Sequence, residues 1–188
     1  MREAALRAAI TLIAENGYGA TSMAQVAEAA GISPSGLAHH FPSRAALLGA
    51  VLDHRDALDS QDVETDPEAP WGGFDHLVEV ARRNMERRRL VQLYTSVIGE
   101  AFSSEHPAHR WMLRHYDSAL EILERPLREG QRRGHVRADA PCARIARSTI
   151  ALMDGLQVQW LLDPGIDMHA ELAAHVEDLK QRWGPPSV

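Results

Sequence analysis

The side chains whose types and spacing best suit chemistry in this chain lie between residues 22 and 44. They are hydroxyl, imidazole and guanidinium groups, which donate hydrogen bonds to DNA phosphates and to the edges of bases. Small residues stand between them, and a helix that lies against base edges needs small or polar groups on that face. By residue type, the candidates for such contacts, with the small residues among them, are Ser22, Ser33, Pro34, Ser35, Gly36, His39, His40 and Arg44.

Local signals place these residues on two short helices joined by a tight turn. Ser22 and Gln25 fit a capping box, in which each side chain accepts a backbone N–H that would otherwise be unpaired. Gly31 follows an apolar helical stretch, where a helix ends at a residue with positive φ. Ser33 is the next N-cap, and Pro34 stands at the first helical position, where its missing N–H is not needed. The pattern predicts a helix-turn-helix, which lays one helix in the major groove of DNA; a plain helical hairpin with its polar residues in water is the alternative.

Residues 2–51 resemble the N-terminal region of the TetR family of bacterial transcriptional regulators. The family pattern runs T-[ST]-x-x-x-[IV]-A-x-x-A-G-[VI]-S and then L-Y-x-H-F-x-[SN]-K. The matching residues are Thr21, Ser22, Val26, Ala27, Ala30, Gly31, Ile32, Ser33, Leu37, His40, Phe41, Ser43 and Arg44. The preceding segment, REAALRAAITLIAENGYGATS, resembles the first helix of the family, which is expected to end at Asn16-Gly17.

The resemblance implies roles for single residues. Ser22 and His40 match family positions that contact phosphates, and Arg44 occupies the position of a usual lysine with the same role. The positions that match contacts with base edges or the nearby backbone are Ser35, Gly36 and His39.

Two residues depart from the family pattern. Ala38 stands where the family usually carries Tyr, so a ring and a hydroxyl used against the DNA backbone are absent. Ala24 stands where a basic residue is frequent. Both departures concern the affinity for DNA and leave the predicted fold unaffected.

Composition limits the class of protein. The chain has 188 residues, 45% of them hydrophobic, and a formal net charge of −6. Acidic residues concentrate between Asp53 and Glu68, so the overall charge says little about a DNA-facing surface at residues 1–52. A single cysteine, Cys142, excludes an internal disulfide, and no signal peptide or long apolar run is evident. These features predict a cytoplasmic protein of one or two small domains that does not interact with membranes.

Beyond a linker expected at residues 60–70, the chain reads as five helices and no strands. We expect them over residues 72–87, 88–102, 108–133, 141–162 and 168–183. Pro126 lies inside the third and is expected to kink or split it. The fold class is therefore all-α, with a three-helix helix-turn-helix head (residues 1–52) and a helical-bundle body for dimerisation and ligand binding (residues 53–188).

Apolar stripes on the last two helices predict a four-helix seam between two copies of the chain, which is also where the TetR-like family dimerises. The seam residues are expected to be Leu152, Leu156, Leu172, Val176, Leu179 and Trp183. A monomer that buries these faces internally is the alternative. A dimer would present two recognition helices to successive major grooves of a near-palindromic operator.

A ligand pocket for a mostly apolar effector is expected among the middle helices, although each candidate residue could also belong to an ordinary core. The candidates are Met85, Tyr94, Trp111, Met112, Met153, Gln157 and Trp160. No P-loop, GxGxxG, GxSxG or HExxH motif is present, so we expect no enzyme and no cofactor. The most metal-like group is Glu105, His106 and His109, with His115 six residues further on. Zinc needs three or four converging ligands, and the proline between the first two histidines indicates a loop that caps the next helix, so no metal is expected.

These observations predict a homodimeric transcriptional repressor that a small-molecule effector releases from its operator. The alternative is a helical ligand-sensing or protein-interaction module with weak or lost DNA binding. The departures at Ala24 and Ala38 and the acidic balance are the features that motivate this alternative.

Overall fold

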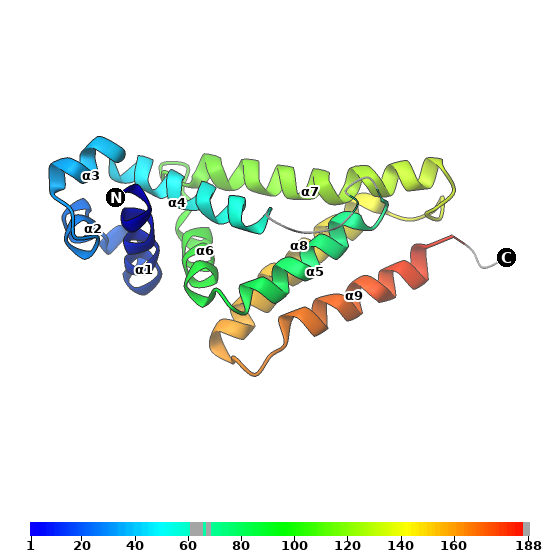
Figure 1. The fold of residues 1–188 in the computed structure, drawn as a ribbon. Helices are drawn as coiled ribbons and strands as arrows, with labels where there is room; N and C mark the ends of the chain where they lie inside the picture. The colour runs from blue at the N-terminus through cyan, green and yellow to red at the C-terminus, as the bar shows by residue number, and fades with distance from the viewer. Residues whose placement is uncertain (61–65, 67–68, 186–188) are drawn as a thin grey trace. The chain divides into compact units, whose positions relative to one another are not determined.

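The computed structural model describes residues 1–60, 66 and 69–185 (Figure 1). Every regular element among these residues is a helix, which confirms the predicted all-α fold. The helices are α1 (Arg2–Ala20), α2 (Met23–Ala29), α3 (Pro34–His40), α4 (Arg44–Asp59), α5 (Gly72–Asn84), α6 (Arg88–Glu100), α7 (His109–Arg132), α8 (Cys142–Leu162) and α9 (Met168–Trp183). In the described part of the chain, no helix combines the length and the apolar character needed to cross a membrane.

The helices form two compact units. Unit 1 contains the described part of residues 1–61 and 87–114, and unit 2 contains the described part of residues 62–86 and 115–188. The predicted head and body, residues 1–52 and 53–188, divide the chain by function, and that division stays a prediction. Most of the predicted linker falls outside the described residues.

Helix α1 is the centre of unit 1 and packs against α2, α3, α4 and α6. Its buried face carries leucine, isoleucine and alanine at helical spacing. The largest fully buried side chains of the unit are Leu6, Ile13, Leu37, Leu47, Leu48, Leu52, Leu93 and Tyr94. The helix-turn-helix is thus held on one long helix that is itself packed on α6.

The end of α1 is irregular at the position where the sequence predicts a stop. Gly17 has φ +79°, and one further turn follows it before Thr21. Glu100 of α6 accepts the backbone N–H of Tyr18 at 3.1 Å, so a side chain from another helix replaces the hydrogen bond that the break removes. A Cβ at Gly17 would lie 3.2 Å from the same Glu100 oxygen.

Unit 2 is built from α5, α8, α9 and most of α7 around one hydrophobic core. The core residues are Phe74, Leu123, Leu127, Val136, Ala140, Cys142, Ile145, Ala146 and Val176. Helix α7 continues through Pro126, so the predicted split does not occur (Figure 1). Proline removes only one backbone donor, and the flanking Leu123 and Leu127 are anchored in the core on either side.

The residues predicted as a dimer seam are partly covered within the protomer. Leu156, Leu172 and Val176 are at most 5% exposed, and Leu179 and Trp183 pack against the core of unit 2. The stripe on α9 faces inward because α9 packs against both α5 and α8. Periodicity predicts that a face is buried but not which helix covers it. Much of this stripe is covered within the protomer, and dimerisation itself stays a prediction.

Candidate nucleic-acid interface and ligand-binding region

The first helix of the helix-turn-helix begins with the predicted capping box. The Ser22 hydroxyl oxygen accepts the Gln25 backbone N–H at 3.3 Å, and the Gln25 side-chain oxygen accepts the Ser22 backbone N–H at 2.8 Å. The Ser22 hydroxyl also donates to that Gln25 oxygen at 2.8 Å. Its hydrogen is therefore already engaged, and a phosphate contact through this hydroxyl requires it to rotate.

The turn between α2 and α3 follows the chemistry of its residues. Gly31 takes φ +66°, and the backbone N–H of Ile32 reaches back to the Ala27 carbonyl at 3.0 Å. The Ser33 hydroxyl then caps α3 by accepting the Gly36 N–H at 3.0 Å. Gly36 has little room for a side chain, since a Cβ there would lie 3.1 Å from the Ser33 oxygen.

Helix α3 is attached to unit 1 by one side and exposes the other. Leu37 is fully buried and Phe41, directly after the helix, is 3% exposed. The predicted DNA-contacting residues on and before α3 that are exposed are Ser33, Pro34, Ser35 and His39, whereas Gly36 and His40 are half-buried. The exposed face is short, small and polar, and Ala38 adds no ring to it.

Arg44, at the start of α4, makes contacts inside unit 1. Its guanidinium donates to the carbonyls of Gly19 and Thr21, each at 3.2 Å, and lies 4.3 Å from the centre of the Tyr18 ring. The side chain is still exposed. It therefore fixes the end of α1 against α4, and its predicted phosphate contact stays a prediction.

The two adjacent histidines differ in their surroundings. Their ring centres are 5.5 Å apart with the ring planes inclined at 62°, and His40 also meets the ring of Phe41 edge-on. This divergence fits two independent contacts better than joint metal ligation. No group of three or more His, Cys, Asp or Glu in the described part of the chain could hold a metal ion.

Three predicted pocket residues lie in unit 1, where they belong to a charged and aromatic cluster. Tyr94 is buried beneath the Arg55 guanidinium, 4.0 Å from its ring centre, and the Trp111 indole N–H donates to Asp53 at 3.0 Å. Met112 is buried nearby in the sequence. Arg55 has a raised pKa: burial opposes its charge most strongly, but the attraction of Asp59, Tyr94 and Asp56 together outweighs it.

The other four predicted pocket residues lie in unit 2. Met153, Gln157 and Trp160 are all at most 5% exposed and recur on one side of α8, and Met85 at the end of α5 is half-buried. The side-chain oxygen of Gln157 is buried without a hydrogen-bond partner among the described residues. Leaving such a group unpaired costs about 1–3 kcal/mol, so this amide is unusual for a core residue.

Several polar residues of unit 2 lie outside the set of site residues predicted from the sequence. Asn84 is 3% exposed, and its side-chain nitrogen, like the Gln157 oxygen, finds no partner among the described residues. Tyr116 donates its hydroxyl to Asp154 at 2.7 Å, and Thr149 lies 2.9 Å from His175 Nε2. Asn84 interrupts an otherwise apolar face of α5, and this is the one signal that could have revealed it.

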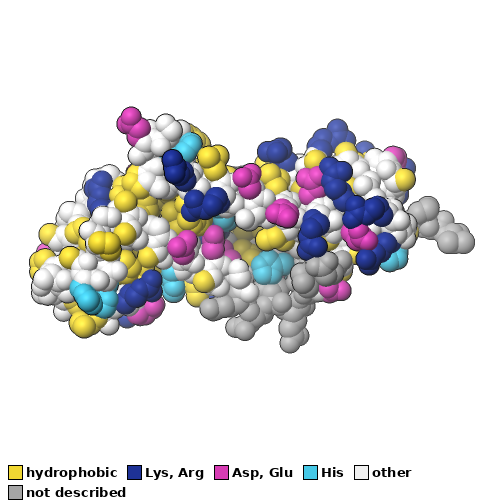
Figure 2. Space-filling model, turned by 90° about the horizontal axis from the view of Figure 1, so that it is seen from above, with side chains coloured by type: hydrophobic (Ala, Val, Ile, Leu, Met, Phe, Trp, Pro, Cys, Tyr) yellow, Lys and Arg dark blue, Asp and Glu magenta, His cyan; other side chains and the backbone are white. Residues whose placement is uncertain are grey.

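The basic run of residues 82–89 is neutralised in part by local acids. Arg82 and Arg83 both donate to Glu79, and Arg87 lies 3.8 Å from Asp59. Figure 2 shows basic side chains gathered over the C-terminal end of α7 with acids among them, and Arg132 and Arg133 there both pair with Glu129. These groups resemble solvated ion pairs more than a second nucleic-acid surface.

Comparison with known proteins supports the reading of both parts of the chain. The family profile described as bacterial regulatory proteins, tetR family, matches residues 5–51. A second profile, described as BetI-type transcriptional repressor, C-terminal, matches residues 75–182. Among curated proteins, none matches the chain.

Solved structures share the fold along nearly the whole chain. A putative TetR-family regulator from Rhodococcus sp. is 23% identical, with a TM-score of 0.74 over 95% of this chain and 97% of the other. NalD of Pseudomonas aeruginosa is 22% identical, with a TM-score of 0.75 over 99% and 97%. SmeT of Stenotrophomonas maltophilia, in complex with triclosan, is 18% identical, with a TM-score of 0.80 over 99% and 92%. With the two profile matches joined to a capped helix-turn-helix, the chain belongs to the TetR family of bacterial transcriptional regulators.

Proposed function

We propose that this DNA-binding regulator represses transcription from a near-palindromic operator and is released by a small-molecule effector. The observation that carries the proposal is the exposed, small and polar face of α3, held rigidly by caps at Ser22, Ser33 and Ser43. Such a face suits the major groove, where side chains must approach base edges closely. Two solved relatives, NalD and SmeT, are described as repressors of multidrug efflux pumps, and this supports repression as the sign of regulation.

The DNA-binding half is tested by selection from a randomised duplex library followed by sequencing. Wild-type protein is expected to enrich a near-palindromic motif. His39→Ala and His40→Ala are expected to weaken binding to it by about tenfold, which corresponds to about 1.4 kcal/mol for a lost contact. His135→Ala is the matched control, because His135 is exposed in unit 2 far along the chain from α3.

Failure to enrich any motif at low salt would contradict the proposal that the protein binds an operator. It would favour the second candidate, a helical sensor without DNA binding. The absence of the usual aromatic ring at Ala38 and the internally engaged hydroxyl of Ser22 are the observations that keep this candidate open.

The dimer is proposed to form through the outward face of α8. Ala151, Val158 and Leu162 fall at helical spacing on this face, and Val158 and Leu162 are 44% and 83% exposed. These apolar side chains share one helix face, and a continuous exposed apolar surface is typical of a binding site between proteins. Partly exposed Leu152 and Leu179 of the predicted seam remain candidates for its margin.

Light scattering after gel filtration tests this interface. Wild-type protein is expected at twice the chain mass of 20.8 kDa. Leu162→Glu is expected to shift it to the monomer mass, since a charge would be buried in an apolar seam. Leu113→Glu, at a leucine of α7 that is 55% exposed, should leave the mass unchanged. A monomeric wild type would contradict the dimer.

Release by effector is proposed as a population shift, in which a ligand favours a conformation whose recognition helices no longer match the groove spacing. The described triclosan complex of SmeT supports a small, mostly apolar effector for a protein of this fold. The first test is titration of the selected DNA complex with triclosan, monitored by fluorescence anisotropy. If neither triclosan nor other apolar compounds released the DNA, the proposed induction by an effector would be contradicted.

A further inference from the structure

Two neutral amide side chains of unit 2 are buried with unused hydrogen-bonding atoms. Asn84 on α5 is 3% exposed and Gln157 on α8 is 2% exposed. Neither the Asn84 nitrogen nor the Gln157 oxygen has a hydrogen-bond partner among the described residues. One atom is a donor and the other is an acceptor, so together they are complementary to a group that both accepts and donates.

Two contacts with α9 place the amides at one end of unit 2. Lys180 donates to Asp75 at 2.7 Å, which ties the start of α5 to the end of α9. Thr149 lies 2.9 Å from His175 Nε2, which ties the middle of α8 to the middle of α9. Both α5 and α8 pack against α9 and run opposite to it in Figure 1.

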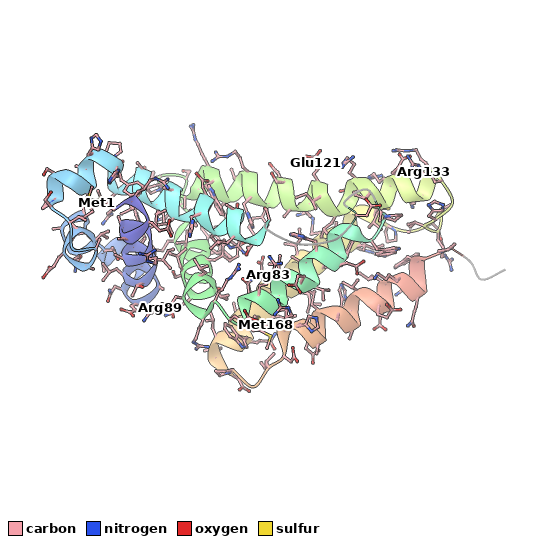
Figure 3. All side chains as sticks on the ribbon, viewed as in Figure 1. Met1, Arg83, Arg89, Glu121, Arg133 and Met168 are labelled. Atoms are coloured by element: carbon pink, nitrogen blue, oxygen red, sulfur yellow. The ribbon has the colours of Figure 1, made fainter. Side chains whose placement is uncertain are left out.

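The helix rise carries these anchors forward to the amides. Asn84 lies nine residues beyond Asp75, about 14 Å along α5, and Gln157 lies eight residues beyond Thr149, about 12 Å along α8. Because α9 runs in the opposite direction, the same numbers of residues are counted back along it, from Lys180 to Glu171 and from His175 to Asp167. Both amides are thereby placed near the first turn of α9, about 6 Å apart along its axis. Met168, which begins that turn and is labelled in Figure 3, is fully buried.

The buried residues four before and three after Gln157 on α8 are large and mainly apolar, and two carboxylates of α5 and α8 are already engaged. Met153 and Trp160 flank Gln157 on the buried side of α8. Asp154, three residues before Gln157, accepts the Tyr116 hydroxyl at 2.7 Å, and Glu79 on α5 is held by Arg82 and Arg83. The unused hydrogen-bonding capacity is therefore neutral, which favours an uncharged ligand.

We propose that Asn84 and Gln157 form the polar end of an effector site in unit 2 that takes an apolar molecule carrying a hydroxyl group. The proposal rests on the effector-released regulator described above and names the chemical class of its ligand. The ligand hydroxyl accepts from the Asn84 nitrogen and donates to the Gln157 oxygen, while its apolar body lies against Met153 and Trp160.

The test compares three probes of similar size: para-butylphenol, its methyl ether para-butylanisole, and butylbenzene. The ether keeps the acceptor and loses the donor, and the hydrocarbon loses both. Dissociation constants are measured by isothermal calorimetry on the full chain and checked by tryptophan fluorescence. Comparing the ratio of constants for phenol and hydrocarbon between proteins cancels the different hydration of the probes.

Asn84→Leu and Gln157→Leu are each expected to lower the preference for the phenol by roughly threefold to tenfold, the effect of one net hydrogen bond. Gln157→Leu should also remove the difference between phenol and methyl ether. Both leucine variants should melt at or above the wild-type temperature, because an unpaired buried amide is removed. Gln159→Leu, at an exposed glutamine of the same helix, is the matched control.

An unchanged preference in both variants, or no binding of any probe, would overturn the proposal. So would a lower melting temperature of both variants with unchanged preference, which would mean that internal water satisfies the amides. Loss of operator selection alongside a shifted probe preference would refute the regulator and leave the hydroxyl site standing.

Discussion

Glu79 illustrates how single residues of unit 2 combine charge with position on a helix. It receives hydrogen bonds from Arg82 and Arg83, one turn further along α5, at 2.8–2.9 Å. These bonds, with that from Arg82 contributing most, lower the pKa of Glu79 from 4.5 to about 2. The carboxylate therefore stays ionised in the folded protein under conditions in which it would be protonated in the unfolded chain.

This shift predicts a pH-dependent difference between wild-type protein and Glu79→Gln. The folded pKa is depressed, so the stabilisation is complete above pH 4.5 and is lost as the pH falls towards 2. At pH 7 it should amount to less than about 1 kcal/mol, because the pair is near the surface and screened by solvent. Thermal melts of both proteins between pH 7 and pH 3 check this.

The difference in melting temperature should shrink as the pH falls below 4.5. Glu121→Gln provides the control, since Glu121 is an exposed carboxylate on α7 (Figure 3). A difference that stayed constant with pH would mean that Glu79 acts through packing alone.

At the scale of single elements, α1 depends on one glycine conformation. Gly17→Ala is expected to destabilise unit 1 by about 1–3 kcal/mol, because φ +79° with ψ 161° is a backbone conformation that essentially only glycine adopts. The new Cβ would also press on the Glu100 carboxylate, 3.2 Å away, which holds the Tyr18 N–H. The free energy of unfolding, obtained from urea titration, is the measurement.

Gly19→Ala is the matched control two residues along the same helix. A Cβ at Gly19 meets no atom within 4 Å, and its φ is ordinary. Alanine there should leave stability unchanged or raise it by up to about 1 kcal/mol. Equal losses at the two glycines would exclude strain at Gly17 as the cause.

Features set by neighbouring residues could be predicted from the sequence, whereas contacts between distant helices could not. The caps at Ser22, Ser33 and Ser43 and the turn at Gly31 depend on residues within four positions of each other, so the sequence specifies them directly. Arg55 is buried against Tyr94, which lies 39 positions further along the chain, and the sequence pattern of neither helix predicts this contact.

The same distinction between local and long-range information applies to unit 2. Periodicity predicts the apolar stripe of α9, but not which helices cover it. In the structure, α9 packs against α5 and α8. Pro126 is predicted to kink or split α7, and the helix continues through it without a split, with leucines on both sides fixed in the core. Tertiary packing outweighed the local preference of one residue.

At the scale of the whole molecule, electrostatics should make DNA binding only weakly dependent on salt. Residues 1–52 carry three arginines and no lysine, and one of them, Arg44, already contacts two carbonyls. If each head neutralises about two phosphates, the slope of log K against log salt for a dimer is about −4. Anisotropy titrations of the selected operator between low and physiological salt measure this slope.

A slope near −10 would show that more cations reach the phosphates than the head supplies. Arg144→Ala and Arg147→Ala, which remove exposed cations of unit 2, would then reveal whether α8 contributes. With the shallow slope expected here, both variants should bind as wild-type protein does.

The three serine caps within residues 22–43 have a consequence for the thermodynamics of recognition. At the start of α2, α3 and α4, the hydroxyl of the cap serine accepts a backbone N–H, so residues 22–43 are already ordered before they bind DNA. Little backbone entropy remains to be lost on association. Calorimetry on the operator complex should then give a heat-capacity change no larger than the buried apolar surface accounts for, without the excess that accompanies coupled folding.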